Sequence, residues 1–320
     1  MDLEVPEGYI SLSVVCFESH RQLNSIYMSM ESKDEGWDHI DFKREVELGE
    51  RIGGGGVGVI YKGWFKNQPV ALKTLFDTRV GEDLKKEYMD ELLVMSKVKH
   101  SNIVEFMGAC MVAPNWCFVM ELCDTSLFCA LHQHREQFSD SEKMQMAVDV
   151  GSAMEYLHSL QPAIIHRDLK SHNVLRAKDG RLKVCDFGLV HVRNPQAGTP
   201  AYMAPELLEG KCFNKSVDVY AFAVLFNEIL EADIPFNGAQ VVDIRERVVR
   251  GDRPLSSPSH MPSPQCNSII TRGWSARPDD RPDFTEVVDV LLDIYDNLPE
   301  QKHLDALQAG GGDMLDSLMK

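Results

Sequence analysis

The sequence has little that would place it in a membrane, outside the cell or on nucleic acid. Its longest apolar run, Val219 to Leu230, is shorter than a bilayer-spanning helix and contains Asn227 and Glu228. Acidic residues precede any apolar run at the N-terminus, unlike in a signal peptide. Lys and Arg number 33 against 49 Asp and Glu, and the formal net charge of −16 disfavours nonspecific binding to nucleic acid or anionic lipid. We therefore expect no membrane span and no nucleic-acid partner.

Patterns typical of disulfide-rich or metal-binding proteins are also lacking. The eight cysteines show no metal-ligand spacing, and Cys110, Cys117 and Cys185 lie in apolar runs. Free, buried thiols in a reducing compartment explain this distribution better than a disulfide framework does. The expected location is the cytoplasm or the nucleus.

The sequence does contain a dense group of polar side chains between two short apolar pairs. The run from Ile164 to Asn173 reads Ile-Ile-His-Arg-Asp-Leu-Lys-Ser-His-Asn. Within it, the Asp168 carboxylate is suited to accept a proton from a hydroxyl, and Lys170 is suited to neutralise a transferring phosphate. The amide oxygen of Asn173 is suited to hold a divalent metal ion.

A glycine-rich segment follows the first clear strand pattern. Residues 46–52 alternate as a strand should, and Gly53, Gly55 and Gly58 then satisfy the spacing G-x-G-x-x-G. That spacing occurs in dinucleotide sites, where a helix follows, and in phosphate-covering loops between two strands. Residues 59–64 are β-branched and aromatic, which favours a second strand and therefore the phosphate-covering loop.

Lys73 ends the next strand pattern, residues 69–73, on the same face as apolar neighbours. Two interpretations are open at this point: a strand-end lysine whose ammonium group reaches water, or a buried cation that needs a carboxylate partner. Glu91 lies in the apolar stripe of the helix-like segment 81–97 and is the candidate partner. Glu87, one turn earlier, is its competitor.

These features occur in the order in which eukaryotic protein kinases have them. The run around Asp168 resembles the kinase catalytic loop, H-R-D-L-x-x-x-N. Asp186-Phe187-Gly188 follows 18 residues after Asp168, and Ala204-Pro205-Glu206 resembles the end of a kinase activation segment. The resemblance covers residues 46–297.

Details within that span resemble one branch of the family. Lys170 and the segment 198–203 resemble the serine/threonine type, because tyrosine kinases usually carry Ala or Arg at the position of Lys170. Residues 40–42, 171–173 and 274–284 resemble the tyrosine-kinase-like group, near Raf and mixed-lineage kinases.

The resemblance implies an α+β, bilobal protein kinase fold, with a small lobe of five antiparallel strands plus one helix and a larger, mostly helical lobe. The implied divisions are an N-terminal extension (1–45), a small lobe (46–121), a hinge (121–124), a large lobe (125–297) and a disordered tail (298–320).

Other segments are predicted from the pattern alone. Residues 10–17 suggest a short strand, and residues 141–160 suggest an amphipathic helix capped by Ser139 or Ser141. The apolar segment 216–231 suggests a central buried helix, and the turn residues 177–180 suggest a hairpin.

The resemblance also implies a nucleotide site. Lys73 would clamp the α- and β-phosphates and pair with Glu91, whose spacing from the turn after its helix matches the family. The backbone of Glu121 and of Cys123 would hydrogen-bond the adenine edge. The residues expected to bind ATP are Ile52, Gly53, Gly54, Gly55, Gly56, Val57, Gly58, Ile60, Ala71, Lys73, Glu91, Met120, Glu121 and Cys123. Val57 departs from the family, which usually has an aromatic residue there.

The resemblance also implies that Asp168, Lys170 and Lys73 are the catalytic residues. Asp168 would orient the incoming hydroxyl. Asn173 and Asp186 would hold Mg²⁺. The residues with implied structural or regulatory roles are Arg167, Thr199, Glu206, Asp218 and Arg281. Among these, Asp218 would bond the backbone of the catalytic loop, and Arg281 would pair with Glu206.

The expected function is an ATP- and Mg²⁺-dependent protein kinase that phosphorylates serine and threonine hydroxyls of protein substrates in intracellular signalling. The alternatives are a pseudokinase or scaffold that binds nucleotide and signals by conformation, and a kinase with tyrosine or dual specificity.

Two further expectations concern the activation segment and a cysteine. Residues 189–198 contain no Ser, Thr or Tyr, so we expect Arg167 to find no activating phosphate there. Cys185 precedes Asp186 and is either a reactive thiol that Mg-ATP protects or an inert buried one.

Overall fold

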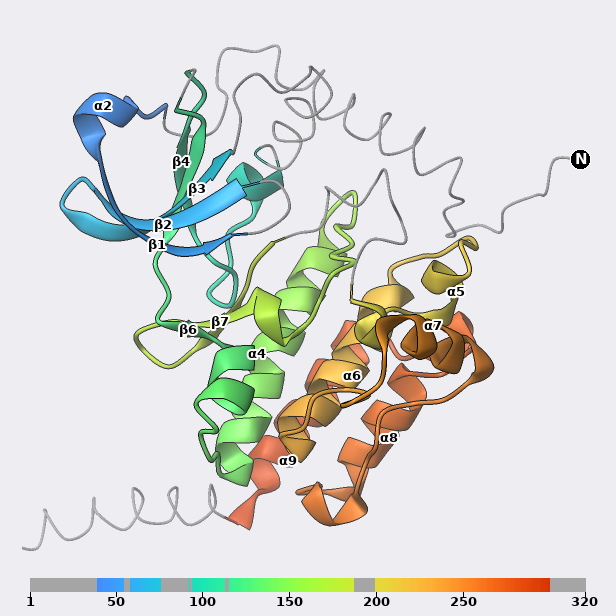
Figure 1. Ribbon diagram of the computed structural model, residues 1–320. Coiled ribbons are helices and arrows are strands. Elements are labelled where there is room, and N and C mark those ends of the chain that lie inside the picture. Colours follow the sequence, from blue (N-terminus) through green and yellow to red (C-terminus); the bar gives the residue numbers. More distant parts are fainter. Residues whose placement is uncertain are drawn as a thin grey trace, which may run out of the picture.

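The structure is a computed structural model that describes residues 39–54, 58–75, 92, 94–112, 115–186 and 199–299. Figure 1 shows an antiparallel sheet lying against a larger, mainly helical body. This arrangement confirms the α+β, bilobal fold. The strand expected at residues 10–17 and the tail beyond residue 299 lie outside the described residues. In the part of the chain that is described, no helix is both long and apolar enough to cross a membrane.

The small lobe is built on a five-stranded antiparallel sheet in the order β1-β2-β3-β5-β4. The strands are β1 (Val46–Gly54), β2 (Gly58–Phe65), β3 (Gln68–Leu75), β4 (Phe106–Cys110) and β5 (Cys117–Glu121). Between β2 and β3, Lys66 and Asn67 both have positive φ (47° and 61°), as a two-residue hairpin turn requires. All five strands expected from the sequence are present.

Residues that precede β1 also pack on this sheet. His39 bridges to Ala109 on β4, the Ile40 N–H donates to the Ala109 carbonyl (3.0 Å), and the Ile40 side chain is buried. The short helix α2 (Phe42–Glu45), capped by the Asp41 carboxylate, then leads into β1. The described end of the N-terminal extension is therefore part of the small lobe.

The one helix expected in the small lobe, over residues 81–97, is described only at its end. Residues 94–97 are helical, and Leu92, Val94 and Met95 are buried in the main hydrophobic core. This core continues into the large lobe, so the end of the helix is held by apolar packing that spans the two lobes.

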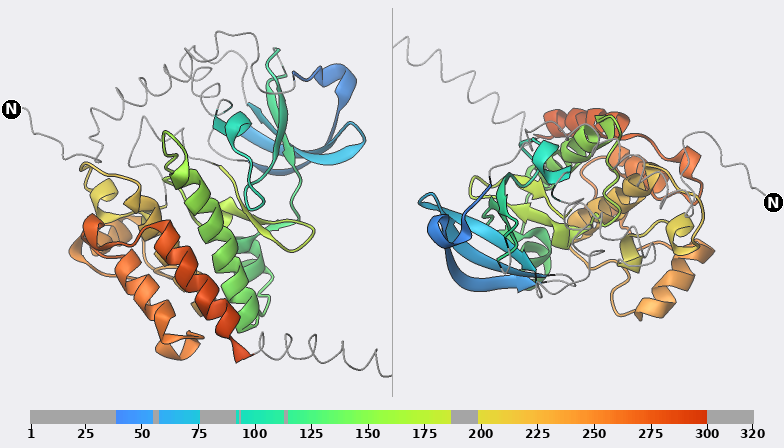
Figure 2. Two further views of the ribbon diagram at one scale, coloured as in Figure 1. Left: turned by 180° about the vertical axis from the view of Figure 1, so that it is seen from behind. Right: turned by 90° about the horizontal axis from the view of Figure 1, so that it is seen from above.

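The large lobe is organised around α6 (Ser216–Glu231), in which every residue from Val217 to Leu230 is buried. Helix α4 (Asp140–Ser159) contacts α6 and also α9 (Phe284–Asn297), beside which it lies in Figure 2. Ser139 caps α4 in a reciprocal pair of hydrogen bonds with Glu142. Helix α6 has its predicted range, α4 begins and ends one residue earlier than predicted, and Ser139 rather than Ser141 is the cap.

The remaining helices complete this lobe. They are α5 (Pro205–Leu208), α7 (Val241–Arg250), α8 (Pro264–Gly273), the π-helical turn η1 (Cys129–Gln133), and the 3₁₀ turns η2 (Ser171–Asn173), η4 (Pro200–Tyr202), η5 (Pro258–His260) and η6 (Pro278–Asp280). Leu298, just after α9, is buried, so packing extends one residue into the segment assigned to the tail.

A second, smaller sheet connects the lobes. Its strands β6 (Thr125–Ser126), β7 (Val174–Arg176) and β8 (Leu182–Val184) are antiparallel, and the β7–β8 turn falls on the predicted residues 177–180. The Val104 N–H, from the segment before β4, donates to the Val184 carbonyl (3.0 Å). The β7–β8 hairpin therefore touches the small lobe while its buried face packs on α4.

Candidate active site

The register of the small-lobe sheet brings the glycine-rich strands beside Lys73. Gly53 on β1 pairs with Ile60 on β2, and Ile60 pairs with Lys73 on β3, so these residues form one row across the sheet. Two residues along the same strand, Ala71 pairs with Met120, and both are almost fully buried. This places nine of the residues expected to bind ATP on adjacent strands: Ile52, Gly53, Gly54, Gly58, Ile60, Ala71, Lys73, Met120 and Glu121.

Ile52 is much more exposed than Ala71 or Met120, and several other members of the expected nucleotide site are not described. Ile52 is on β1 with 48% of its surface exposed. Gly55, Gly56, Val57 and Glu91 lie outside the described residues, as do Phe187 and Gly188. The expected Lys73–Glu91 pair therefore stays a prediction.

Lys73 has a carboxylate partner in the other lobe. Its Nζ lies 2.9 Å from Oδ1 of Asp186, which follows β8, and the Lys73 side chain is only 14% exposed. The positive charge of Lys73 lowers the pKa of Asp186 and outweighs burial, which acts in the opposite direction. Of the two interpretations of Lys73, the structure shows the paired cation, with its side chain largely covered.

The catalytic-loop side chains meet at Asp168. Oδ2 of Asp168 accepts hydrogen bonds from Lys170 Nζ (2.7 Å) and Asn173 Nδ2 (2.9 Å), and Asn173 Nδ2 also donates to the Asp168 carbonyl (2.8 Å). The Cys185 N–H donates to the Asn173 carbonyl (2.9 Å). This last bond places Asn173 next to the backbone that carries Asp186.

Asp218, at the start of α6, is hydrogen-bonded to the backbone of the catalytic loop. Its fully buried carboxylate accepts hydrogen bonds from the N–H groups of His166 and Arg167 and from Nε2 of His158, each at 2.8 Å. Burial alone raises the pKa of Asp218, but these hydrogen bonds, led by that from His158, bring it below the usual value. The bonds support an uncommon backbone, since Arg167 has a φ of 67°.

His166 joins the catalytic loop to the residue before Asp186. The Asp168 N–H donates to Nδ1 (3.3 Å), and Nε2, which then carries the proton, donates to the Cys185 carbonyl (3.0 Å). We assigned no role to His166 from the sequence. Its position two residues before Asp168 was visible there, but the contact with Cys185 depends on the folded chain.

Among the described residues, Arg167 packs on an aromatic ring and forms no ion pair with an acid. Its guanidinium lies over the Phe213 ring at 5.2 Å, Nε has no hydrogen-bond partner among the described residues, and burial lowers its pKa. Residues 189–198, where no activating phosphate is expected, lie outside the described part. Thr199 is the first described residue after that gap and directly precedes η4.

Two buried carboxylates of the large lobe fix the segment that follows Thr199. Glu206 on α5 receives two hydrogen bonds from Arg281, Nη1 at 2.6 Å and Nη2 at 2.9 Å, which is the pair that the family resemblance implied. Glu228 on α6 is fully buried and accepts hydrogen bonds from the Tyr202 hydroxyl and from Ser171 Oγ, both at 2.7 Å.

Glu228 was not identified from the sequence. Its third contact is with His132 Nε2 on η1 (2.8 Å), so one carboxylate joins the catalytic loop, the segment before α5 and η1. The available signal was its position as a charged residue in an apolar run, but its contacts are 26 to 96 residues away in the sequence.

Burial and a neighbouring charge disfavour the thiolate form of Cys185. Burial, and secondarily the charge of Asp186, raises its pKa well above the ordinary value, and the thiolate is the reactive form. Of the two expectations for this residue, the structure supports the inert one.

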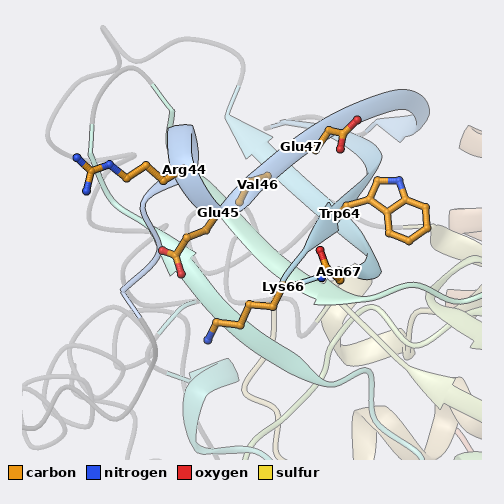
Figure 3. Close-up of a pocket in the computed structure, with 7 residues that line it drawn as sticks. All are labelled: Arg44, Glu45, Val46, Glu47, Trp64, Lys66 and Asn67. Atoms are coloured by element: carbon orange, nitrogen blue, oxygen red, sulfur yellow. The ribbon is translucent and has the colours of Figure 1, made fainter.

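A cavity of about 380 Å³ lies away from these groups, at the start of β1 and the β2–β3 turn (Figure 3). Its lining mixes both signs of charge and contains no residue of the expected active site: Arg44, Glu45, Val46, Glu47, Trp64, Lys66 and Asn67. It is not the candidate catalytic cleft.

The sequence of residues 46–291 matches the family model described as protein tyrosine and serine/threonine kinase. The chain belongs to this kinase family. Relatives of this kinase in Arabidopsis thaliana include the serine/threonine-protein kinases STY17 (31% identical over 92% of the chain), STY46 (33% over 84%) and CTR1 (35% over 77%). These relatives confirm the resemblance to kinases of the serine/threonine type within the tyrosine-kinase-like group.

The kinase chain spans only part of these relatives. It covers 53% of the length of STY17, 48% of STY46 and 31% of CTR1. The residues matched by the family model, 46–291, contain the site assembled above.

Proposed function

We propose that the chain is an ATP-dependent protein kinase that transfers the γ-phosphate to serine and threonine hydroxyls of protein substrates in intracellular signalling. The observation that carries this proposal is that two hydrogen-bonded groups lie next to each other. In one, Lys73 contacts Asp186; in the other, Lys170 and Asn173 contact Asp168. The bond from the Cys185 N–H to the Asn173 carbonyl links them. Phosphoryl transfer requires mainly positioning and charge neutralisation, and these two groups supply both. We further propose that the protein acts in the cytoplasm or the nucleus.

The oxygen donors of Asn173 and Asp186 fit Mg²⁺. Asn173 uses its amide nitrogen in both bonds to Asp168, which leaves the amide oxygen for a cation, and the lowered pKa keeps Asp186 ionised. Carboxylate and amide oxygens are ligands that Mg²⁺ accepts when nucleotide phosphates complete its shell. Bound there, the ion would neutralise charge on the phosphates.

The chain's own residues would perform the remaining steps. Asp168 would orient the acceptor hydroxyl and take its proton. Lys170, which lies 2.7 Å from Asp168, would place a positive charge where the transferred phosphate passes. Lys73 would fix the other phosphates from the small-lobe side.

The test of specificity is phosphoamino-acid analysis of a generic protein substrate labelled with [γ-³²P]ATP. We expect phosphoserine and phosphothreonine, because Lys170 and the segment 198–203 resemble the serine/threonine type. Phosphotyrosine alone would contradict the proposal, and phosphotyrosine beside the other two would indicate dual specificity.

A second expected result concerns activation. Between Asp186 and Glu206 the only hydroxyls are Thr199 and Tyr202, and Tyr202 is buried and bonded to Glu228. We therefore expect intact-mass analysis of active enzyme to show no stoichiometric phosphate in this segment. A full phosphate on Thr199, together with loss of activity on phosphatase treatment, would contradict this expectation.

A further inference from the structure

The β7–β8 hairpin has a proposed Mg²⁺ ligand at each end. Asn173 directly precedes β7, and Asp186 follows β8 by two residues. The Cys185 N–H to Asn173 carbonyl bond (2.9 Å) closes these two ends against each other. The hairpin therefore sets where both ligands lie.

The same hairpin is attached to the hinge at two points. Lys183, in the middle of β8, places Nζ 2.7 Å from Oε2 of Glu121, the last residue of β5. One strand away, the Asp124 N–H donates to the Arg176 carbonyl on β7 (2.8 Å). The first contact joins charged side chains, and the second is a backbone bond.

The Glu121–Lys183 pair is well covered for an ion pair between long side chains. The Lys183 side chain is 10% exposed and that of Glu121 26% exposed. Strand alternation sends Leu182 and Val184 into the core and leaves Lys183 on the other face, toward the hinge. Glu121 is in turn fixed by Glu105, whose N–H donates to its carboxylate (3.3 Å).

We infer that Glu121 and Lys183 are positioning residues that set the separation between the hinge and the two Mg²⁺ ligands. The inference rests on the proposed function, in which adenine binds at the hinge and the phosphates bind near Asn173 and Asp186. MgATP contacts both the hinge and the two Mg²⁺ ligands, so its affinity depends on the separation between them. The affinity of adenosine, which occupies only the hinge end, does not.

The test is calorimetric titration of the full chain with MgATP and with adenosine. Replacing either partner, Lys183→Met or Glu121→Met, is expected to raise the Kd for MgATP about tenfold, since a hydrogen bond between charged groups is lost. The Kd for adenosine is expected to rise less than about threefold, because the hinge backbone is retained. The double variant should resemble the single variants, because both remove the same contact.

The matched control is Arg272→Met, which removes the cation of an exposed ion pair with Glu286 in the large lobe. It should change neither Kd, and thermal unfolding should show each variant folded. Equal weakening of MgATP and adenosine, unchanged MgATP binding, or effects that add in the double variant would each overturn the inference. A wild-type chain that binds MgATP but transfers no phosphate would contradict only the proposed kinase activity, whereas one that binds no MgATP would contradict both.

Discussion

Asp168→Asn is expected to lower kcat by about 10²- to 10⁴-fold, the range associated with loss of a positioned general base. The amide has nearly the shape of the carboxylate, but it cannot take the proton of the acceptor hydroxyl. It also removes the charge that Lys170 and Asn173 now contact at 2.7 and 2.9 Å. Steady-state kinetics with a protein substrate would give kcat, and calorimetry would show MgATP binding close to that of the wild type.

This result separates an enzyme from a pseudokinase. A pseudokinase or scaffold would have no turnover to lose, so equal, background-level phosphate transfer by wild type and variant would favour that alternative. The matched control is Asp289→Asn, which changes an exposed carboxylate on α9, away from the candidate site. It should leave kcat unchanged.

Arg281→Met is expected to reduce the free energy of unfolding by about 3–5 kcal/mol, because it leaves a buried carboxylate without its partner. The Arg281 side chain is fully buried and Glu206 is 7% exposed, so water cannot replace the lost bonds. Arg281 also donates to the carbonyls of Ser216 and Ser275. Urea denaturation followed by circular dichroism would measure the loss.

Two comparisons make this result specific to the buried pair. The double variant Glu206→Gln/Arg281→Met removes the stranded charge and should recover part of the loss. Arg272→Met, which breaks an exposed pair with Glu286, should cost less than about 1 kcal/mol. A loss as small for Arg281→Met as for Arg272→Met would show that the buried pair does not stabilise the lobe.

The features that could be predicted from the sequence are those whose signal lies in neighbouring residues. The alternation of residues 46–52, the long apolar run of α6 and the turn residues 177–180 each predicted the correct element, because each of these signals depends on neighbouring residues. The order of the site residues was also readable, since Asp168, Asn173 and Asp186 lie close together in the chain.

Contacts between distant segments were not readable in the same way. Nothing local to Lys183 indicates that it reaches Glu121, 62 residues earlier, and nothing local to His158 indicates that it donates to Asp218, 60 residues later. Such partners are decided by how helices and sheets pack, and many pairings suit the same local pattern. The charge of Glu228 within an apolar run signalled a buried partner without saying which one.

The attachment of His39 and Ile40 to Ala109 has a consequence for how separate molecules of this protein behave toward one another. β4 is the outermost strand of its sheet, and the Ile40 N–H occupies a carbonyl that would otherwise face outward. A strand edge with unpaired N–H and C=O groups can pair with a strand of a neighbouring molecule. A shortened chain that began at Val46 would keep every proposed catalytic residue, yet it would expose this edge and lose a guard against self-association.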